Sequence, residues 1–286
     1  PRADFKARLR NELEGRVLLT TKTAAKSAAK TAGKIREGFR AVTPYLTVPD
    51  VFAEIEFVKA AFGAEGQVYG LGSAGGYHSE YKVGDSMVMI GGGGGKSKWK
   101  GEPSPASLHV YVEDVDDVYR RASQAGAKSL MPPTDMDYGE RSGAIEDPGG
   151  NHWYLATAFG PSYVPEGRLD LMPHFSLRGT KKMIDFLESA FAAETLAVHE
   201  SPDGVVHHAV VSIVDSIVEM GEAHGPWQAR PMHFMLYVDD ADAWYARAMK
   251  AEGAISMGEP SDQPYGARVG IIKDPFDNVW YVATPL

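Results

Sequence analysis

Apolar residues follow two different periods along this chain. Residues 45–48 (Tyr-Leu-Thr-Val) alternate between side chains with a hydroxyl group and apolar side chains. Apolar residues then recur at spacings of four, three and four, at Val51, Ile55, Val58 and Phe62. Strict alternation is typical of a half-buried strand, and the second spacing is typical of one face of a helix. The pattern therefore predicts a strand followed by an amphipathic helix.

The same succession of periods returns further along the chain. Leu108, Val110 and Val112 alternate before helical spacings over 115–125, and residues 241–251 repeat those helical spacings. Short segments interrupted by Gly, Pro and Asp follow each helix and predict short strands. We interpret the chain as four β-α-β-β-β units.

An internal repeat groups these units in pairs. Residues 61–65 (AFGAE) return as 190–194 (AFAAE), and Trp-Tyr-x-Ala-Thr occurs at both 153–157 and 280–284. Matches in one order at nearly constant spacing indicate a duplication. The sequence predicts a first domain over 41–158, a linker over 159–170 and a second domain over 171–286, after a basic extension over 1–40.

The extension differs from the rest of the chain in charge. Lys22, Lys26, Lys30 and Lys34 recur every four residues with little apolar surface between them, which is typical of a solvated helix. We predict that deleting residues 1–35 changes the melting temperature by a few degrees at most. The acidic remainder should repel nucleic acid, so only this arm is expected to contact it.

Composition limits the chemistry that the chain can perform. Cysteine is absent, which excludes disulfides and thiolate catalysis, so any metal must be held by His, Asp, Glu or Tyr. No apolar run is long enough to span a membrane and no secretory signal is visible. We expect a cytoplasmic monomer or homodimer without membrane contact.

The ends of both repeats carry a family resemblance. Asp-Pro-x-x-Asn precedes the last strand in each copy, at 147–151 and 274–278. With four βαβββ units, this resembles the vicinal oxygen chelate superfamily of glyoxalases, bleomycin-resistance proteins and extradiol dioxygenases, and segments such as 43–46 and 61–65 resemble its PhnB-like branch. The resemblance implies an α+β fold in which paired units form cup-shaped sheets with helices outside and a ligand inside.

Strand parity identifies the residues expected inside the cups. Phe234, Leu236 and Val238 should pack under a helix, whereas the opposite parity should face a ligand. Trp153 and Trp280 are predicted to anchor the helix side. The predicted ligand-binding residues are Tyr45, His109, Tyr111, His152, Tyr154, Tyr237 and Tyr281.

The resemblance also implies a possible set of metal ligands in the second repeat. Glu219 and His233 fall on family ligand positions, His174 lies one same-face step from a third, and Tyr281 replaces the fourth. Together, His174, Glu219 and His233 suit one divalent Fe, Mn, Ni or Zn ion. The alternative is that these histidines are neutral, hydrogen-bonded to Glu219 or Tyr281, and that no metal binds.

One structural question stays open at this point, namely which units pair. Successive units can share a cup, or the first unit can pair with the fourth and the second with the third. In the swapped arrangement His174 and Glu219 would face His109, and His233 would lie in the other cup. In either arrangement we expect His174 to be the partner of the buried Glu219 carboxylate.

Two functions are compatible with these features. The first is a binding protein of the glyoxalase and bleomycin-resistance type that sequesters a small aromatic or cationic compound. The second is a metal-dependent lyase, isomerase or dioxygenase acting on a substrate with vicinal oxygens, with Glu219 and His174 as catalytic residues.

Two features lie outside the predicted ligand-binding and metal-binding residues. His78 and His208 are expected to line the cup mouths, and the glycine run 91–95 is expected to begin a mobile loop.

Overall fold

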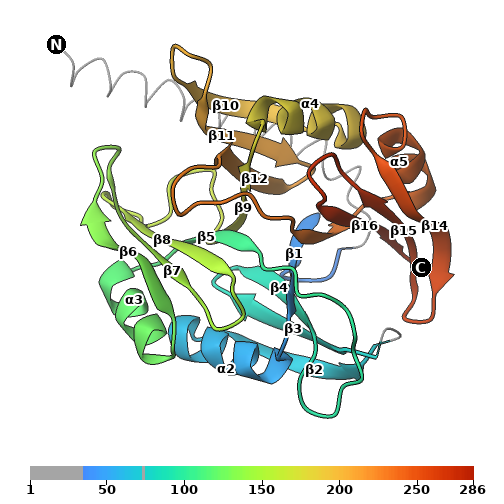
Figure 1. Ribbon diagram of the computed structural model, residues 1–286, viewed down its shortest axis with the longest axis horizontal. Helices are drawn as coiled ribbons and strands as arrows, with labels where there is room; N and C mark the ends of the chain where they lie inside the picture. Colours follow the sequence, from blue (N-terminus) through green and yellow to red (C-terminus); the bar gives the residue numbers. More distant parts are fainter. Residues whose placement is uncertain (1–34, 73–74) are drawn as a thin grey trace.

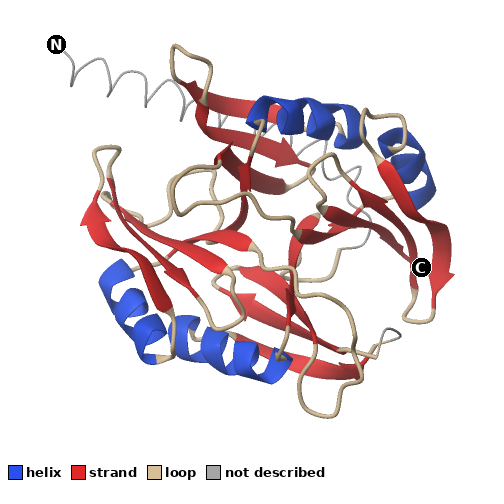
Figure 2. Ribbon diagram, viewed as in Figure 1, coloured by secondary structure: helices blue, strands red, loops and turns tan. Residues whose placement is uncertain are grey.

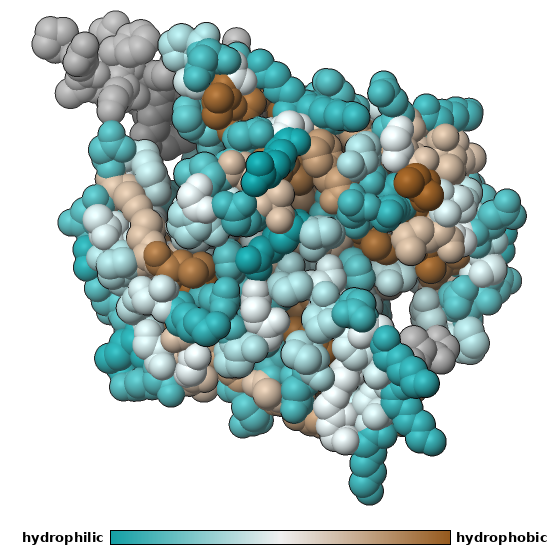
Figure 3. Space-filling view, viewed as in Figure 1, coloured by the Kyte–Doolittle hydropathy of each residue, from teal (hydrophilic) through white to brown (hydrophobic). Residues whose placement is uncertain are grey.

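The computed structural model describes residues 35–72 and 75–286 (Figure 1). The predicted lysine stripe of the extension lies outside these residues. Within them, no helix is both long enough and apolar enough to cross a membrane. The view in Figure 3 shows a mainly hydrophilic surface on which hydrophobic residues form small separate groups.

The first repeat consists of two βαβββ units, as the periodicity predicts. Its elements are β1 (Val42–Val48), α2 (Val51–Phe62), β2 (Glu65–Leu71), β3 (Tyr77–Val83), β4 (Ser86–Gly92), β5 (Ser107–Tyr111), α3 (Val115–Gln124), β6 (Lys128–Asp135), β7 (Glu140–Glu146) and β8 (His152–Ala158).

The second repeat has the same order of elements. They are β9 (Leu171–Leu177), α4 (Thr180–Phe191), β10 (Glu194–Glu200), β11 (Val206–Ile213), β12 (Ser216–Glu222), β13 (His233–Tyr237), α5 (Ala241–Ala248), β14 (Ile255–Gln263), β15 (Ala267–Lys273) and β16 (Val279–Pro285).

The strands form two eight-stranded mixed sheets, and each sheet takes one unit from each repeat. One has the order β14-β15-β16-β13-β1-β4-β3-β2 and the other β10-β11-β12-β9-β5-β8-β7-β6. Antiparallel pairs join the units, with Tyr45 opposite His233 in one sheet and Leu108 opposite Pro173 in the other. The swapped arrangement is therefore the one that this chain adopts.

The helices cover the outer faces of the sheets, and the main core lies beneath them (Figure 2). Phe234, Leu236 and Val238 belong to this core, as parity predicts, whereas Met235 and Tyr237 belong to a separate cluster on the opposite face. Alternate residues of each strand thus pack into the helix-side core, and the residues between them face the inner side of the sheet.

The Asp-Pro-x-x-Asn segment has a structural role that explains its recurrence. Asp147 accepts hydrogen bonds from the Asn151 amide and the Trp153 indole, while the Asn151 side chain accepts one from the Ala106 backbone. Trp153 and Trp280 are fully buried, which confirms them as core anchors. Asp274 and Asn278 repeat the arrangement. The motif fastens each final strand to the strand beside it.

The glycine run is divided between the sheet and the predicted loop, because residues 93–95 lie in the β4–β5 connection and the first two glycines do not. Gly91 and Gly92 are the last residues of β4. A Cβ atom at Gly91 would lie 2.6 Å from the Tyr45 hydroxyl, and one at Gly92 would overlap the Val48 carbonyl. Glycine is required here because β4 approaches β1 too closely for a side chain.

Candidate functional site

The inner face of each sheet carries a different chemistry. We call the face formed by units two and three, around His109, His174 and Glu219, the charged cup. The face formed by units one and four, around Tyr45 and Tyr281, is the tyrosine cup. These residues come from neighbouring central strands of their sheets, so each pair of units brings together side chains far apart in sequence.

A buried carboxylate lies at the centre of the charged cup. Glu219, on β12, is 1% exposed, and the facing side chains that approach it are cationic or can become so. His109 Nδ1 lies 2.6 Å from Glu219 Oε2, Arg168 Nε lies 3.3 Å from Oε1, and His208 Nε2 lies 3.7 Å from Oε2. Three residues from three segments therefore compensate a single negative charge.

These contacts shift the pKa values of both partners. Burial opposes the charge of Glu219, but the attraction and hydrogen bond of His109, with help from His208, hold the pKa of the carboxyl well below its ordinary value. Burial likewise opposes the charge of His109, and Glu219 outweighs it and raises the pKa of the imidazole. We therefore describe the pair as an imidazolium and a carboxylate.

Arg168 reaches the cup from the segment that the sequence indicated only as a linker. Its neighbours Val164 and Leu169 pack against an inner-face cluster that contains Tyr111 and Met172. The segment therefore contributes side chains to the charged cup as well as joining the repeats. Sequence reasoning missed Arg168, although the need of a lone buried carboxylate for a cation was the signal that could have found it.

His174 is not the partner of Glu219 that we expected. It lies beside Glu219 across the β9–β12 pairing, but its Nδ1 is buried without a hydrogen-bond partner. Its ring instead contacts the Tyr154 ring, with 4.6 Å between centroids. Burial lowers the pKa of His174 to about 3, so the imidazole is neutral. The role assigned to His174 passes to His109.

An aromatic wall continues from His174 toward the rim of the charged cup. The Trp227 ring lies 5.0 Å from that of Tyr154 and 6.2 Å from that of His152. Arg230 Nη2 lies 2.7 Å from His152 Nε2, and Nη1 donates a 2.7 Å hydrogen bond to the Gly150 carbonyl. Trp227 and Arg230 lie on the β12–β13 connection, where no periodicity marked them.

Tyr111 extends the polar side of the same cup. Its hydroxyl donates to Glu140 at 2.8 Å, and its ring lies 4.6 Å from that of His109. Of the seven predicted ligand-binding residues, the charged cup thus gathers Tyr111, His109, His152 and Tyr154. The other three, Tyr45, Tyr237 and Tyr281, lie in the tyrosine cup.

The tyrosine cup has an apolar residue at its centre, and its buried carboxylate lies on the next strand of the sheet. Met89 occupies the place that Glu219 has in the charged cup, because both lie next to the central residue of the adjoining strand. The Tyr45 hydroxyl lies 3.0 Å from His78 Nδ1. The nearby carboxylate, Glu80, is bound by both terminal nitrogens of Arg36, at 2.9 and 2.5 Å.

His233 lies in the tyrosine cup, where its Nδ1 is 3.1 Å from the Thr47 hydroxyl. The swapped pairing thus places it in a different sheet from His174 and Glu219, so the predicted three-residue metal set is not assembled. In the charged cup, Arg168 and His109 already occupy both oxygens of Glu219. The described residues contain no group of three His, Asp or Glu side chains placed to hold a metal. This donor set does not fit a metal ion.

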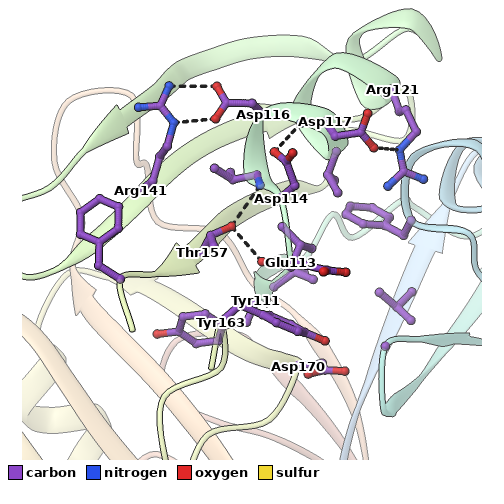
Figure 4. A pocket seen from close by; sticks show the side chains of 18 residues that line it. Tyr111, Glu113, Asp114, Asp116, Asp117, Arg121, Arg141, Thr157, Tyr163 and Asp170 are labelled. Carbon is purple, nitrogen blue, oxygen red and sulfur yellow. Dashed lines mark hydrogen bonds and ion pairs between the residues drawn. The ribbon is translucent and has the colours of Figure 1, made fainter. Parts of the chain in front are cut away.

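A cavity of about 660 Å³ lies next to the charged cup rather than within it. Figure 4 shows it at the start of α3, near Tyr111 and the linker residue Tyr163. Most of its charged groups are already satisfied: Arg141 binds Asp116 with two nitrogens, and Asp114 caps the helix. We therefore place the candidate site in the charged cup, where buried polar atoms are left without partners.

The family follows from this fold and from the sequence. The profile described as "Glyoxalase/Bleomycin resistance protein/Dioxygenase superfamily" matches residues 39–155 and 176–282. The chain belongs to this superfamily. Its two tandem glyoxalase-like domains account for the four βαβββ units.

Named relatives and a solved structure agree with that membership. The chain is 26% identical to "Putative glyoxylase CFP32" of Mycobacterium tuberculosis over 65% of this chain and 72% of that protein. It is 27% identical to "Anthracycline biosynthesis protein DnrV" of Streptomyces peucetius over 78% and 86%, respectively. Glyoxalase I from Zea mays has the same fold, with a TM-score of 0.64 and 15% identity over 90% of this chain and 94% of that one.

Proposed function

We propose that this protein binds a small aromatic compound in the charged cup and sequesters it without chemical conversion. The observation that carries the proposal is a cluster of unpaired polar atoms. Four of the seven buried side-chain polar atoms without a hydrogen-bond partner, among the described residues, belong to this cup: Ser107 Oγ, Tyr154 Oη, Arg168 Nη1 and His174 Nδ1.

Such atoms are costly unless something satisfies them. Each unpaired buried polar group destabilises a folded protein by about 1–3 kcal/mol. The Tyr154 hydroxyl lies near Ser176 but without the geometry of a hydrogen bond. A ligand that hydrogen-bonds to these atoms would recover this free energy, and the rings of Tyr154 and Trp227 offer it an aromatic surface.

The tyrosine cup is less suited to the same function. None of the unpaired buried atoms in the described part of the chain belongs to its inner residues, because Tyr45 and His233 have partners. The cationic compound that the sequence also allowed is disfavoured in the charged cup, since Arg168, Arg230 and protonated His109 would repel it.

Tryptophan fluorescence tests the proposal, because Trp227 contacts Tyr154 of the charged cup, whereas Trp153 and Trp280 are buried in the helix-side core and Trp99 and Trp244 lie on the β4–β5 connection and on α5. Titration with 2-naphthamide and 2-naphthoate should quench the wild-type emission, and Trp227→Phe should remove most of that quenching. Tyr154→Ala should weaken binding at least tenfold. Quenching that persists unchanged in Trp227→Phe would place the ligand elsewhere and overturn the assignment.

The metal-dependent lyase, isomerase or dioxygenase that the sequence also allowed is less well supported, because His109 and Arg168 contact the two oxygens of Glu219 and His233 lies in the other cup. Metal analysis of protein purified without chelator separates the two functions. A stoichiometric transition metal would favour the enzyme. Loss of that metal in Glu219→Gln would identify Glu219 as one of the residues that bind it.

A further inference from the structure

Arg230 differs from the other charged side chains of the charged cup. Arg168 and His109 share Glu219, whereas Arg230 forms no ion pair with any described residue. It is partly buried, and its two hydrogen bonds go to the Gly150 carbonyl and the ring of His152. A guanidinium offers five N–H donors, so three are left for a ligand.

The surroundings of Arg230 do not neutralise it. Burial and the adjacent guanidinium lower the pKa of His152 to about 4, so this histidine accepts a hydrogen bond as a neutral ring. Burial lowers the pKa of Arg230, and the attraction of Glu146 and Asp147, neither within ion-pair distance, only partly offsets it. Glu146 is paired with Lys128 and also lies 3.5 Å from His152 Nε2. The two groups that hydrogen-bond to Arg230 are thus neutral, and the nearby carboxylate is shared with Lys128.

The connection that carries Arg230 is fixed by its own hydrogen bonds. The backbones of His224 and Trp227 bond reciprocally, at 2.9 and 2.8 Å, and the side chain of Gln228 accepts from Arg178. Trp227, three residues before Arg230, contributes to the aromatic wall. An aromatic surface and a guanidinium without an ion pair therefore lie together on one connection. Because the connection is already held by hydrogen bonds, a ligand would need to order little of it on binding.

We propose that Arg230 determines specificity in the charged cup by selecting an aromatic carboxylate. The ring of the ligand lies against Tyr154 and Trp227, and its carboxylate accepts hydrogen bonds from Arg230. A planar guanidinium matches a carboxylate with two parallel hydrogen bonds, which a neutral amide cannot reproduce. This inference rests on the proposed function and names the ligand class.

Two matched probes test the charge preference. 2-Naphthoate and 2-naphthamide share the same ring system and differ in charge at one substituent. Calorimetric titration at pH 7 should give an affinity at least tenfold higher for 2-naphthoate with the wild-type protein. Arg230→Gln should abolish that preference by weakening only 2-naphthoate, and Arg230→Lys should restore part of it. Arg120→Gln, an exposed arginine paired with Asp117 on α3, is the control and should change neither affinity.

The outcomes separate the two proposals. Equal affinity of the wild-type protein for both probes, or an equal loss of both in Arg230→Gln, would overturn the role of Arg230 and leave aromatic binding in the cup intact. Failure of the wild-type protein to bind either probe would overturn the proposed function as well. Thermal melting of Arg230→Gln and Arg230→Lys verifies that the variants are folded at the titration temperature.

Discussion

Each cup has one buried carboxylate, but the two carboxylates lie on different strands of equivalent strand pairs. In the tyrosine cup Glu80 on β3 lies opposite Met89 on β4, whereas in the charged cup Val210 on β11 lies opposite Glu219 on β12. The acid and the apolar residue have thus exchanged strands, a displacement of about 4.8 Å. Only in the charged cup does the acid reach the centre of the sheet.

The compensation of the two carboxylates follows a common plan. Each receives an arginine from the segment that precedes the first strand of a repeat, Arg36 before β1 and Arg168 before β9. The Arg36 side chain is 51% exposed and that of Arg168 is 16% exposed. Each carboxylate is also approached by a histidine, since His78 Nε2 lies 3.4 Å from Glu80 and His109 Nδ1 lies 2.6 Å from Glu219. The cups therefore differ in the position of the acid and in the unpaired polar atoms of the charged cup, which assign the site to that cup.

The largest difference between the cups should appear when the buried partner is removed. His109→Ala leaves Glu219 with Arg168 and a longer contact to His208, and we expect a loss of about 3 kcal/mol in the free energy of unfolding. Urea denaturation at pH 6 measures it. His109→Ala combined with Glu219→Leu removes the buried carboxylate and should recover part of the loss, the remainder being the ion pair that Arg168 then lacks. A loss below about 1 kcal/mol in the single variant would contradict the central role of His109.

Acid should weaken both cups through their neutral histidines, which are His152 and His174 in the charged cup and His233 in the tyrosine cup. The pKa values of His152 and His233 are lowered to about 4, mainly by burial, with Arg230 adding to the effect at His152. The unfolded chain therefore takes up protons first as the pH falls below about 6.5, and stability is lost between pH 6.5 and 4. His152→Gln and His233→Gln should each reduce that loss by about 2 kcal/mol in urea titrations at several pH values. A loss as large as that of the wild-type protein would contradict the lowered pKa.

Ligand binding should depend on one cup only. Glu219→Gln and His174→Ala are expected to weaken 2-naphthoate binding at least tenfold, about 1.4 kcal/mol, because they alter the floor of the charged cup. Met89→Leu changes the equivalent position of the tyrosine cup with little change in volume and should leave the affinity unchanged. A larger effect from Met89→Leu than from Glu219→Gln would move the binding site to the tyrosine cup.

Truncation of the N-terminus should have the smallest effect and locate where the extension becomes structural. Ile35 packs against the inner cluster of the tyrosine cup, so the shorter truncation ends one residue before the 1–35 deletion that the sequence suggested. Deleting residues 1–34 should shift the melting temperature by a few degrees at most. Deleting residues 1–36 also removes Arg36 and should cost about 1 kcal/mol more, because the buried Glu80 then has only His78 nearby. Equal melting temperatures for both truncations would show that Arg36 does not stabilise the cup.

The sequence alone determined the order of the elements, their duplication and the parity of each strand. These properties depend on neighbouring residues: helical and alternating periods in 51–62 and 234–238 select the element and its buried face regardless of the partner. The resemblance based on the Asp-Pro-x-x-Asn segments identified the family correctly. It also identified Glu219 as a residue of inward parity, and the structure buries its side chain.

The tertiary structure alone decided which units pair, and with them the composition of the site. Repeated units offer similar strand edges, so the local pattern fits a neighbouring or a swapped partner equally well, and the choice depends on contacts between distant segments. That choice brought His109 to Glu219 and moved His233 to the other sheet. Arg168 and Arg230 lie in connections without periodicity. Their roles arise only because the closed fold leaves a buried charge and an aromatic wall beside them.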